Sequence, residues 1–348
     1  MRAGSAGKAR RVKILISSHA FAPSIGGIET ASALLAEEFS KRDHAVTIVT
    51  QTVAKNGEQF PFPIVRQPAL SKLFHLISWC DVFWQNNLSL RTLWPALLLR
   101  KPVVITHQGS YCRRPSGLDF AQRIKHAVAN RMTGVAISKY VAACFKNPSV
   151  IIPNPYDAPV FTNKTPTAER SADLIFVGRL VSEKGLDILL ESLARLRSRG
   201  LHPQLTVVGS GPELTAMQAL AHKIDINNQV RFLGAKTGAE LAGILNQHKV
   251  LVVPSRYDEP FGIVALEGIA CGCVVVAAGG GGLPEAIGAC GITFPNGDVD
   301  ALANALEKLL AAPNDLSQFT TSAAQHLARF QPATIADAYL NLFQSKLQ

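Results

Sequence analysis

The sequence lacks the features that mark membrane-spanning or secreted proteins. It has no run of about 18 uncharged apolar residues, so we expect no membrane-spanning helix. The apolar run at 93–99 ends at Arg100 and Lys101. The basic start of the chain is followed by an apolar run that is too short for a signal peptide. We therefore expect a chain that neither crosses a membrane nor carries a leader.

Cysteine is scarce and has no metal-binding spacing. The six cysteines are scattered, and the closest two, Cys271 and Cys273, are separated by one residue rather than two. This spacing predicts neither a zinc site nor a redox pair. The cytoplasm is the simplest location for such thiols.

Charge is also low, at 17% of residues, and is unevenly placed. Residues 1–158 hold 20 Lys and Arg against eight Asp and Glu, a net charge of +12, and the rest of the chain carries −2. A basic surface suits nucleic acid, an anionic membrane or an acidic substrate, or it is only a solvated face. Aromatic residues are few and are not interleaved with the basic ones, so we expect no nucleic-acid partner. A peripheral position on the inner face of the plasma membrane stays open, through Arg113, Arg114, Arg123, Lys125, Arg131 and Lys139.

The chain does contain an alternation of short Val- and Ile-rich runs with helical patterns. This rhythm is typical of parallel sheets with crossover helices. A polar segment with three prolines, 154–171, interrupts the series, which then starts again. We predict an α/β fold with two doubly wound, Rossmann-like domains that face each other across a cleft. The predicted strands are 12–18, 46–50, 103–106, 135–138 and 150–153, and then 174–178, 205–209, 230–233, 250–254 and 274–277.

The most informative segment is 254–267. A predicted strand ends there, a loop carries Glu259, and a helix starts near Phe261. Unpaired N–H groups at a helix start attract anions, and Gly262 would let a ligand approach the backbone. Glu267 follows along the helix, so two carboxylates flank an anion site, which suits a nucleotide sugar. The alternative is a capping acid with a solvated Glu. A glycosidase pair needs carboxyls about 5 to 9.5 Å apart across one bond, and it is disfavoured because one carboxylate lies in a loop and the other two turns into a helix.

Two cations follow another predicted strand. Arg179 and Lys184 lie at a loop and at the start of the next helix, where they suit a diphosphate or are plain surface cations. Gly209 opens a glycine turn that lacks the third glycine of a dinucleotide fingerprint. A tight turn explains it equally well.

A glycine turn and a histidine lie at the carboxyl ends of two predicted strands, where ligand sites usually form. Gly26 and Gly27 form a turn after the first strand, and His107 lies at the carboxyl end of another. A lone histidine is often structural. Asp298 and Asp300 directly precede a predicted helix, so we interpret them as caps rather than as metal ligands.

These segments resemble those of retaining glycosyltransferases of the GT-B fold, family four, and they follow one another along the chain in the family's order. The most specific element is the spacing of Glu259 and Glu267, the family's E-x7-E motif, with Phe261 and Gly262 inside it. The resemblance covers nearly the whole chain. The other matching segments are 153–154, 178–180, 184–185, 209–212 and 281–285.

The resemblance implies transfer of a sugar, with retention, from a nucleoside diphosphate sugar to a hydroxyl. A UDP-sugar is the first guess for the donor, and a sugar or a lipid-linked molecule for the acceptor. Such enzymes act in polysaccharide, lipopolysaccharide or glycolipid synthesis. They need no metal and no cofactor, since the nucleoside diphosphate sugar is a co-substrate. The final helix should return to the first domain. The expected domains are then 1–158 with about 333–348, on the acceptor side, and 159–332, on the donor side.

The resemblance also implies roles for individual residues. Arg179 and Lys184 would stabilise the departing diphosphate, Glu259 would hold sugar hydroxyls, and His107 would lie near the reacting sugar carbon. Glu267 would bind the ribose. The remaining donor-binding residues would be Gly26, Gly27, Gly209, Phe232, Leu233, Phe261, Gly262, Ile263 and Val264.

Two positions depart from the family's pattern. Gln108 separates His107 from Gly109, which affects the acceptor loop, and Asp258 and Pro260 flank Glu259 where the family often has Glu-Gly. Two other functions remain compatible with the sequence: a sugar phosphorylase of similar fold, and a non-catalytic protein that binds nucleotides or nucleic acid.

Overall fold

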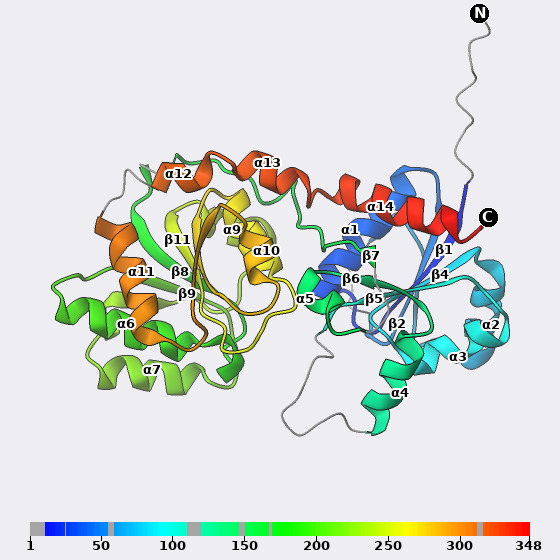
Figure 1. The fold of residues 1–348 in the computed structure, drawn as a ribbon, viewed down its shortest axis with the longest axis horizontal. Coiled ribbons are helices and arrows are strands. Elements are labelled where there is room, and N and C mark those ends of the chain that lie inside the picture. The colour runs from blue at the N-terminus through cyan, green and yellow to red at the C-terminus, as the bar shows by residue number, and fades with distance from the viewer. Residues whose placement is uncertain are drawn as a thin grey trace, which may run out of the picture. The chain divides into compact units, whose positions relative to one another are not determined.

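The computed structural model describes residues 11–24, 26–54, 59–109, 120–145, 150–166, 169–311 and 316–348. The chain divides into two compact units. Unit 1 comprises Met1–Ala136, Phe145–Ile152 and Ile335–Gln348, and unit 2 comprises Ile137–Cys144 and Pro153–Thr334. Each unit contains one parallel sheet with helices around it (Figure 1).

Unit 1 has a seven-stranded sheet in the order β3-β2-β1-β4-β5-β6-β7, and all its strand pairs are parallel. The order reverses between β1 and β4, which is where ligands bind in such sheets. Its strands are β1 (Lys13–Ser18), β2 (Ala45–Thr50), β3 (Ile64–Arg66), β4 (Val82–Asn86), β5 (Val103–His107), β6 (Thr133–Ala136) and β7 (Val150–Ile151). Its helices include α1 (Gly27–Lys41), α2 (Leu70–Trp79), α3 (Leu90–Leu98) and α4 (Phe120–Ala129).

The last helix, α14 (Pro332–Ser345), packs against α1 through its unit 1 residues. The Trp84 ring lies 4.8 Å from that of Tyr339, and Phe39 of α1 lies 5.8 Å from Phe343. Thr106 accepts a hydrogen bond from the Trp84 indole (2.8 Å) and bonds the Tyr339 hydroxyl (2.7 Å). The predicted return of the final helix to the first domain is therefore confirmed.

Unit 2 has a six-stranded parallel sheet in the order β10-β9-β8-β11-β12-β13. The order reverses between β8 and β11. Its strands are β8 (Ala172–Val177), β9 (Leu205–Val208), β10 (Val230–Phe232), β11 (His248–Val253), β12 (Val274–Ala278) and β13 (Gly291–Phe294). Its helices are α5 (Lys139–Ala142), α6 (Leu186–Ser198), α7 (Leu214–Lys223), α8 (Gly238–Leu245), α9 (Ile263–Ala270), α10 (Leu283–Ile287), α11 (Val299–Ala311), α12 (Ser317–Thr320) and α13 (Ala323–Ala328).

Two predicted Rossmann-like sheets are thus present, and the expected α/β fold is confirmed. The interpretation of Asp298 also holds, because its Oδ1 accepts a hydrogen bond from the Ala301 N–H at the start of α11 (2.9 Å). We expected all the cysteines to be free thiols, but Cys144 is disulfide-bonded. Within the described residues, no helix is long and apolar enough to cross a membrane.

Candidate functional site

The polar residues singled out in unit 2 gather at the carboxyl edge of its sheet, where β8 and β11 pair side by side. The loop after β8 carries Arg179 and Lys184, and the loop after β11 carries Glu259. The strand order reverses between these two strands, so their loops diverge and leave room for a ligand. Residues about 75 positions apart are therefore brought together at this edge.

Glu259 is the centre of this group and is only 7% exposed. Its Oε1 lies 2.5 Å from Lys184 Nζ and accepts a hydrogen bond from the Ser255 hydroxyl at 2.6 Å. Its Oε2 accepts a hydrogen bond from the Tyr257 hydroxyl at 2.8 Å. A buried carboxylate needs such partners, because an unpaired one would be costly. Glu259 is therefore a positioned anion, and the capping alternative is wrong, because the N-cap of α9 is Gly262 and no side chain caps this helix start.

Tyr257 also shapes the surroundings of this pair. Burial, followed by the negative charge of Glu259, raises the pKa of the Tyr257 hydroxyl well above its usual range. The hydroxyl therefore stays protonated and donates to the carboxylate. The Lys184 ammonium lies 5.4 Å from the centre of the Tyr257 ring, within the range of a cation–π contact. Sequence reasoning missed Ser255 and Tyr257, although both lie within four residues of Glu259.

Arg179 differs from Lys184 in its contacts. Its side chain is exposed and makes no hydrogen bond or ion pair with the described residues. Arg256, the other nearby arginine of these loops, pairs with Asp187, and its backbone N–H donates to Glu183 O (2.9 Å). Arg179 is thus a cation available to a ligand beside an already neutralised Lys184–Glu259 pair.

Glycines allow these loops to approach one another closely. Gly185 has φ +67°, and a Cβ there would lie 2.0 Å from the Pro254 carbonyl oxygen in the loop after β11. Gly209 has φ +151°, and its Cβ would lie 1.8 Å from the Gly178 carbonyl oxygen. Neither position tolerates a side chain. Gly209 therefore holds the loop after β9 against the loop after β8, which fits the tight-turn interpretation.

Helix α9 begins directly after the Glu259 loop. Phe261 is buried and its ring lies 5.7 Å from that of Phe330, so its side chain belongs to the core. Gly262 precedes the helix, and Ile263 and Val264 form its first turn, half-buried. The backbone of this turn, rather than its side chains, is what a ligand could reach. At the edge strand β10, Phe232 and Leu233 are half-buried and offer apolar surface.

Glu267 is half-buried on the second turn of α9, and its carboxyl makes no hydrogen bond with the described residues. Burial, with a smaller contribution from the charge of Asp157, raises the pKa of the Glu267 carboxyl to about 8. At neutral pH the carboxyl is therefore mainly protonated in the absence of a ligand. A protonated carboxyl can both donate to and accept from a hydroxyl pair.

The raised pKa of Glu267 predicts a pH-dependent stability. Between about pH 4.5 and 8 the folded protein holds this proton more tightly than the unfolded chain, so stability falls as the pH rises through that window. We expect the Glu267→Gln protein to melt at a higher temperature than the wild type at pH 9 and at the same temperature at pH 5. Thermal unfolding at both pH values, with the exposed Glu191→Gln as a control, tests this. An equal shift at pH 5 and pH 9 would contradict it.

In unit 1, His107 is 1% exposed at the end of β5, and its ring lies 4.1 Å from that of Phe145. Burial, followed by the charge of His126, lowers the pKa of His107 to about 4, so the imidazole is neutral at pH 7. The neighbouring Gln108 donates to Asn86 Oδ1 at 2.7 Å. Gln108, the residue between His107 and Gly109, therefore connects the loop after β5 to the end of β4.

The turn between β1 and α1 contains the other two glycines. Gly26 precedes α1 without a side-chain cap, and Gly27 is its first residue. A Cβ on Gly26 would lie 2.6 Å from Glu29 Oε2, so Glu29 folds back over the turn. This carboxylate occupies the space beside the helix start, which makes an anion less favourable there than the sequence suggested.

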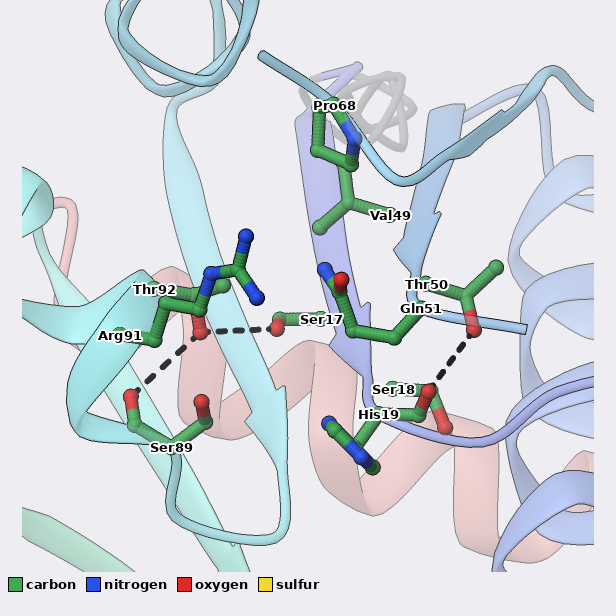
Figure 2. A pocket seen from close by; sticks show the side chains of 10 residues that line it. All are labelled: Ser17, Ser18, His19, Val49, Thr50, Gln51, Pro68, Ser89, Arg91 and Thr92. Carbon is green, nitrogen blue, oxygen red and sulfur yellow. Dashed lines mark hydrogen bonds between the residues drawn. The ribbon is translucent and has the colours of Figure 1, made fainter. Parts of the chain in front are cut away.

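A pocket lies at the point of strand reversal in unit 1, at the carboxyl ends of β1 and β2 and the start of α3 (Figure 2). The Arg91 guanidinium and the Gln51 amide point into it. Thr92 links its wall to Ser17 through a 3.1 Å hydrogen bond between hydroxyls. The lining contains no acidic residue and consists of Ser17, Ser18, His19, Val49, Thr50, Gln51, Pro68, Ser89, Arg91 and Thr92.

Comparisons with known proteins agree with this architecture. Residues 157–326 match the family described as Glycosyl transferases group 1. The D-inositol 3-phosphate glycosyltransferase of Corynebacterium jeikeium is 38% identical over 178 residues, which cover 49% of this chain and 42% of that protein. A glycogen synthase of Mycobacterium tuberculosis is 35% identical over 175 residues, with the same coverage of 49% and 42%. The match thus spans less than half the length of these curated relatives.

Solved structures match over nearly the whole chain. Anabaena Alr3699/HepE, crystallised with UDP, has a TM-score of 0.80 and 22% identity, covering 96% of this chain and all of that one. WaaG, a glycosyltransferase involved in lipopolysaccharide biosynthesis, has a TM-score of 0.72 and 17% identity, covering 95% and 99%. These likenesses show the fold. Residues 157–326 of unit 2 are therefore similar to the group 1 glycosyltransferases, and the two units together have the GT-B fold.

Proposed function

We propose that the protein is a retaining glycosyltransferase that moves a sugar from a nucleoside diphosphate sugar to a hydroxyl acceptor. The observation that carries this is the pairing of Lys184 with the buried Glu259 beside an unpaired Arg179, at the strand reversal of unit 2. A diphosphate needs cations, and a sugar ring needs a fixed acceptor of hydroxyl hydrogen bonds. UDP is the first choice of nucleotide, supported by the UDP and UDP-glucose complexes of HepE.

In this proposal Lys184 changes partners when the donor binds. The incoming diphosphate draws the ammonium away from Glu259 Oε1, and a sugar hydroxyl donates to the oxygen in its place. Ser255 and Tyr257 keep the carboxylate in position during the exchange. Arg179, Lys184 and the uncapped start of α9 then stabilise the charge that develops on the departing diphosphate.

Retention would follow from front-face substitution. The leaving phosphate oxygen takes the acceptor's proton as the new glycosidic bond forms on the same face of the sugar, and no enzyme nucleophile is needed. Neutral His107 is proposed to contact the reacting sugar. Glu267 is proposed to bind the ribose hydroxyls and the half-buried Phe232 and Leu233 to contact the base.

The pocket of unit 1 is proposed as part of the acceptor site. Its hydroxyls, Gln51 and Arg91 can hydrogen-bond a sugar or a phosphate-bearing acceptor, and it lies at the strand reversal where such sheets bind ligands. A lipid-linked acceptor would require contact with a membrane, which we propose for the basic unit 1. Arg113 and Arg114 of the basic cluster lie outside the described residues; Arg123 and Arg131 are exposed.

We expect UDP to raise the melting temperature in the presence of a chelator, since a ligand that binds the folded state stabilises it by mass action. The Arg179→Ala protein should show a clearly smaller shift. Arg195→Ala, which removes an exposed arginine paired with Asp300 on another face of unit 2, is the control. If no common nucleoside diphosphate shifts the melting temperature, and Arg179→Ala changes nothing, the donor site is wrongly assigned.

Screening nucleotide sugars for slow hydrolysis, with mass-spectrometric detection, identifies the donor. Release of a nucleoside diphosphate supports the transferase. Sugar 1-phosphate formed only with inorganic phosphate would indicate a phosphorylase, and binding without turnover would indicate a non-catalytic nucleotide-binding protein.

A further inference from the structure

Helix α3 is apolar on both of its faces. It buries Leu93, Pro95 and Ala96 against unit 1, as a core helix does. The opposite face exposes Trp94 (46%), Leu97 (46%) and Leu98 (67%), and Leu99 directly after the helix is 37% exposed. Trp94, Leu97 and Leu98 are spaced by three and four residues, so they form one stripe, here called the α3 outer face. Soluble helices place polar residues on this side, and a contiguous apolar patch marks an interaction site.

The α3 outer face is a fixed surface rather than a set of loose side chains. The Trp94 ring lies 5.4 Å from the Phe74 ring of α2, in an edge-on arrangement. Helices α2 and α3 lie side by side (Figure 1). The Lys101 ammonium donates to the carbonyls of Ser78 (2.7 Å) and Cys80 (2.8 Å), which ties the segment after α3 to the end of α2.

Helices α2 and α3 and the residues directly after α3 carry cationic side chains and no acidic ones. The side chains of Lys72, Arg91 and Arg100 are exposed and make no hydrogen bond or ion pair with the described residues. The single acidic residue between positions 70 and 101 is Asp81, and its Oδ2 accepts a hydrogen bond from the Lys13 N–H at 2.8 Å. An apolar patch with cationic side chains nearby complements a layered surface that has anionic groups outside and an apolar layer beneath them.

We propose that the α3 outer face docks on an anionic lipid bilayer. Leu97 and Leu98 enter the boundary between headgroups and acyl chains, Trp94 lies at the interface, and Lys72 and Arg100 contact lipid phosphates. The inference rests on the proposed membrane contact and assigns it to α2 and α3 rather than to α4. Since Arg91 also lines the pocket of unit 1, a bilayer at this face would lie beside the proposed acceptor site.

Vesicle co-sedimentation tests the proposal with the full chain. We expect binding to vesicles of phosphatidylcholine with phosphatidylglycerol, weaker binding at high salt, and little binding to pure phosphatidylcholine. The double variant Leu97→Ser/Leu98→Ser should bind at least about tenfold more weakly, because it removes the apolar insertion. Val53→Ser, which changes an equally exposed apolar residue of unit 1, is the matched control and should bind normally.

Trp fluorescence locates the contact. The chain has three tryptophans, of which Trp84 is fully buried. Brominated phosphatidylglycerol vesicles should quench the emission, and Trp94→Phe should abolish most of the quenching. Arg100→Glu should reduce binding, whereas Lys223→Glu in unit 2 should not. Thermal melts check that each variant is folded.

Three results would overturn the proposal. One is normal binding by the Leu97→Ser/Leu98→Ser protein. Another is binding that is lost in Arg123→Glu/Lys125→Glu but not in Arg100→Glu, which would move the contact to α4. The last is a dimer, seen by sedimentation velocity without lipid, that Leu98→Glu converts to monomers that still bind vesicles. The UDP-dependent melting shift of the α3 variants should stay unchanged, which separates failure of this proposal from failure of the donor site.

Discussion

Glu259→Gln is expected to lower the rate of sugar transfer at least about tenfold while leaving UDP binding nearly intact. The carboxylate is held by Ser255 and Tyr257 in one orientation, and hydrogen bonds to charged groups contribute about 1.5 to 3 kcal/mol. Glutamine keeps the shape but offers one acceptor oxygen instead of two. The sugar would then be misplaced relative to the diphosphate, and misplacement near the reacting atoms can cost about a hundredfold in rate.

Separate measurement of donor hydrolysis, transfer and the UDP-induced melting shift tests this expectation. Glu240→Gln, at an exposed glutamate of α8 that pairs with Lys236, is the matched control and should transfer normally. Full transferase activity in a folded Glu259→Gln protein would refute the assignment of the sugar-binding role. Loss of UDP binding together with activity would instead place Glu259 at the diphosphate.

The regular parts of the fold could be predicted from hydrophobic patterning, and three strands could not. β4 (Val82–Asn86) was missed because it ends in Gln85 and Asn86, which look like loop residues. Both side chains are buried and hydrogen-bonded to other elements: Gln85 donates to Thr92 Oγ1 of α3 (2.8 Å) and Asn86 to Ser32 Oγ of α1 (2.6 Å). β3 (Ile64–Arg66) has three half-buried residues, and β13 (Gly291–Phe294) starts at a glycine, so neither shows a long apolar run.

The residues of the candidate site could be named from the sequence, but their mutual contacts could not. Lys184 and Glu259 meet because β8 and β11 are neighbours, although β9 and β10 lie between them in the chain. The strand order decides this, and the order follows from crossover connections rather than from local patterning. The partial burial of Glu267, which raises the pKa of its carboxyl, is likewise a tertiary effect, because its position in the sequence predicts only which turn of α9 it occupies.

Lys184→Ala is expected to have the largest effect on transfer, a loss of about 100- to 1,000-fold, which is typical when one preorganised donor to a developing negative charge is removed. It should also lower the free energy of unfolding by about 1 to 2 kcal/mol. The reason is that Glu259, 7% exposed, would keep its charge without a cation. Steady-state kinetics and thermal unfolding measure the two effects.

The double variant Lys184→Ala/Glu259→Gln separates the catalytic effect from the structural one. Glutamine in place of Glu259 removes the charge that the first substitution leaves unpaired, so the double variant should recover part of the lost stability. It should recover none of the activity, because the cation for the leaving diphosphate is still absent. Recovery of both together would mean that Lys184 acts only by holding the loops in place. Loss of stability equal to the sum of the single variants would show that the ion pair does not couple the two positions.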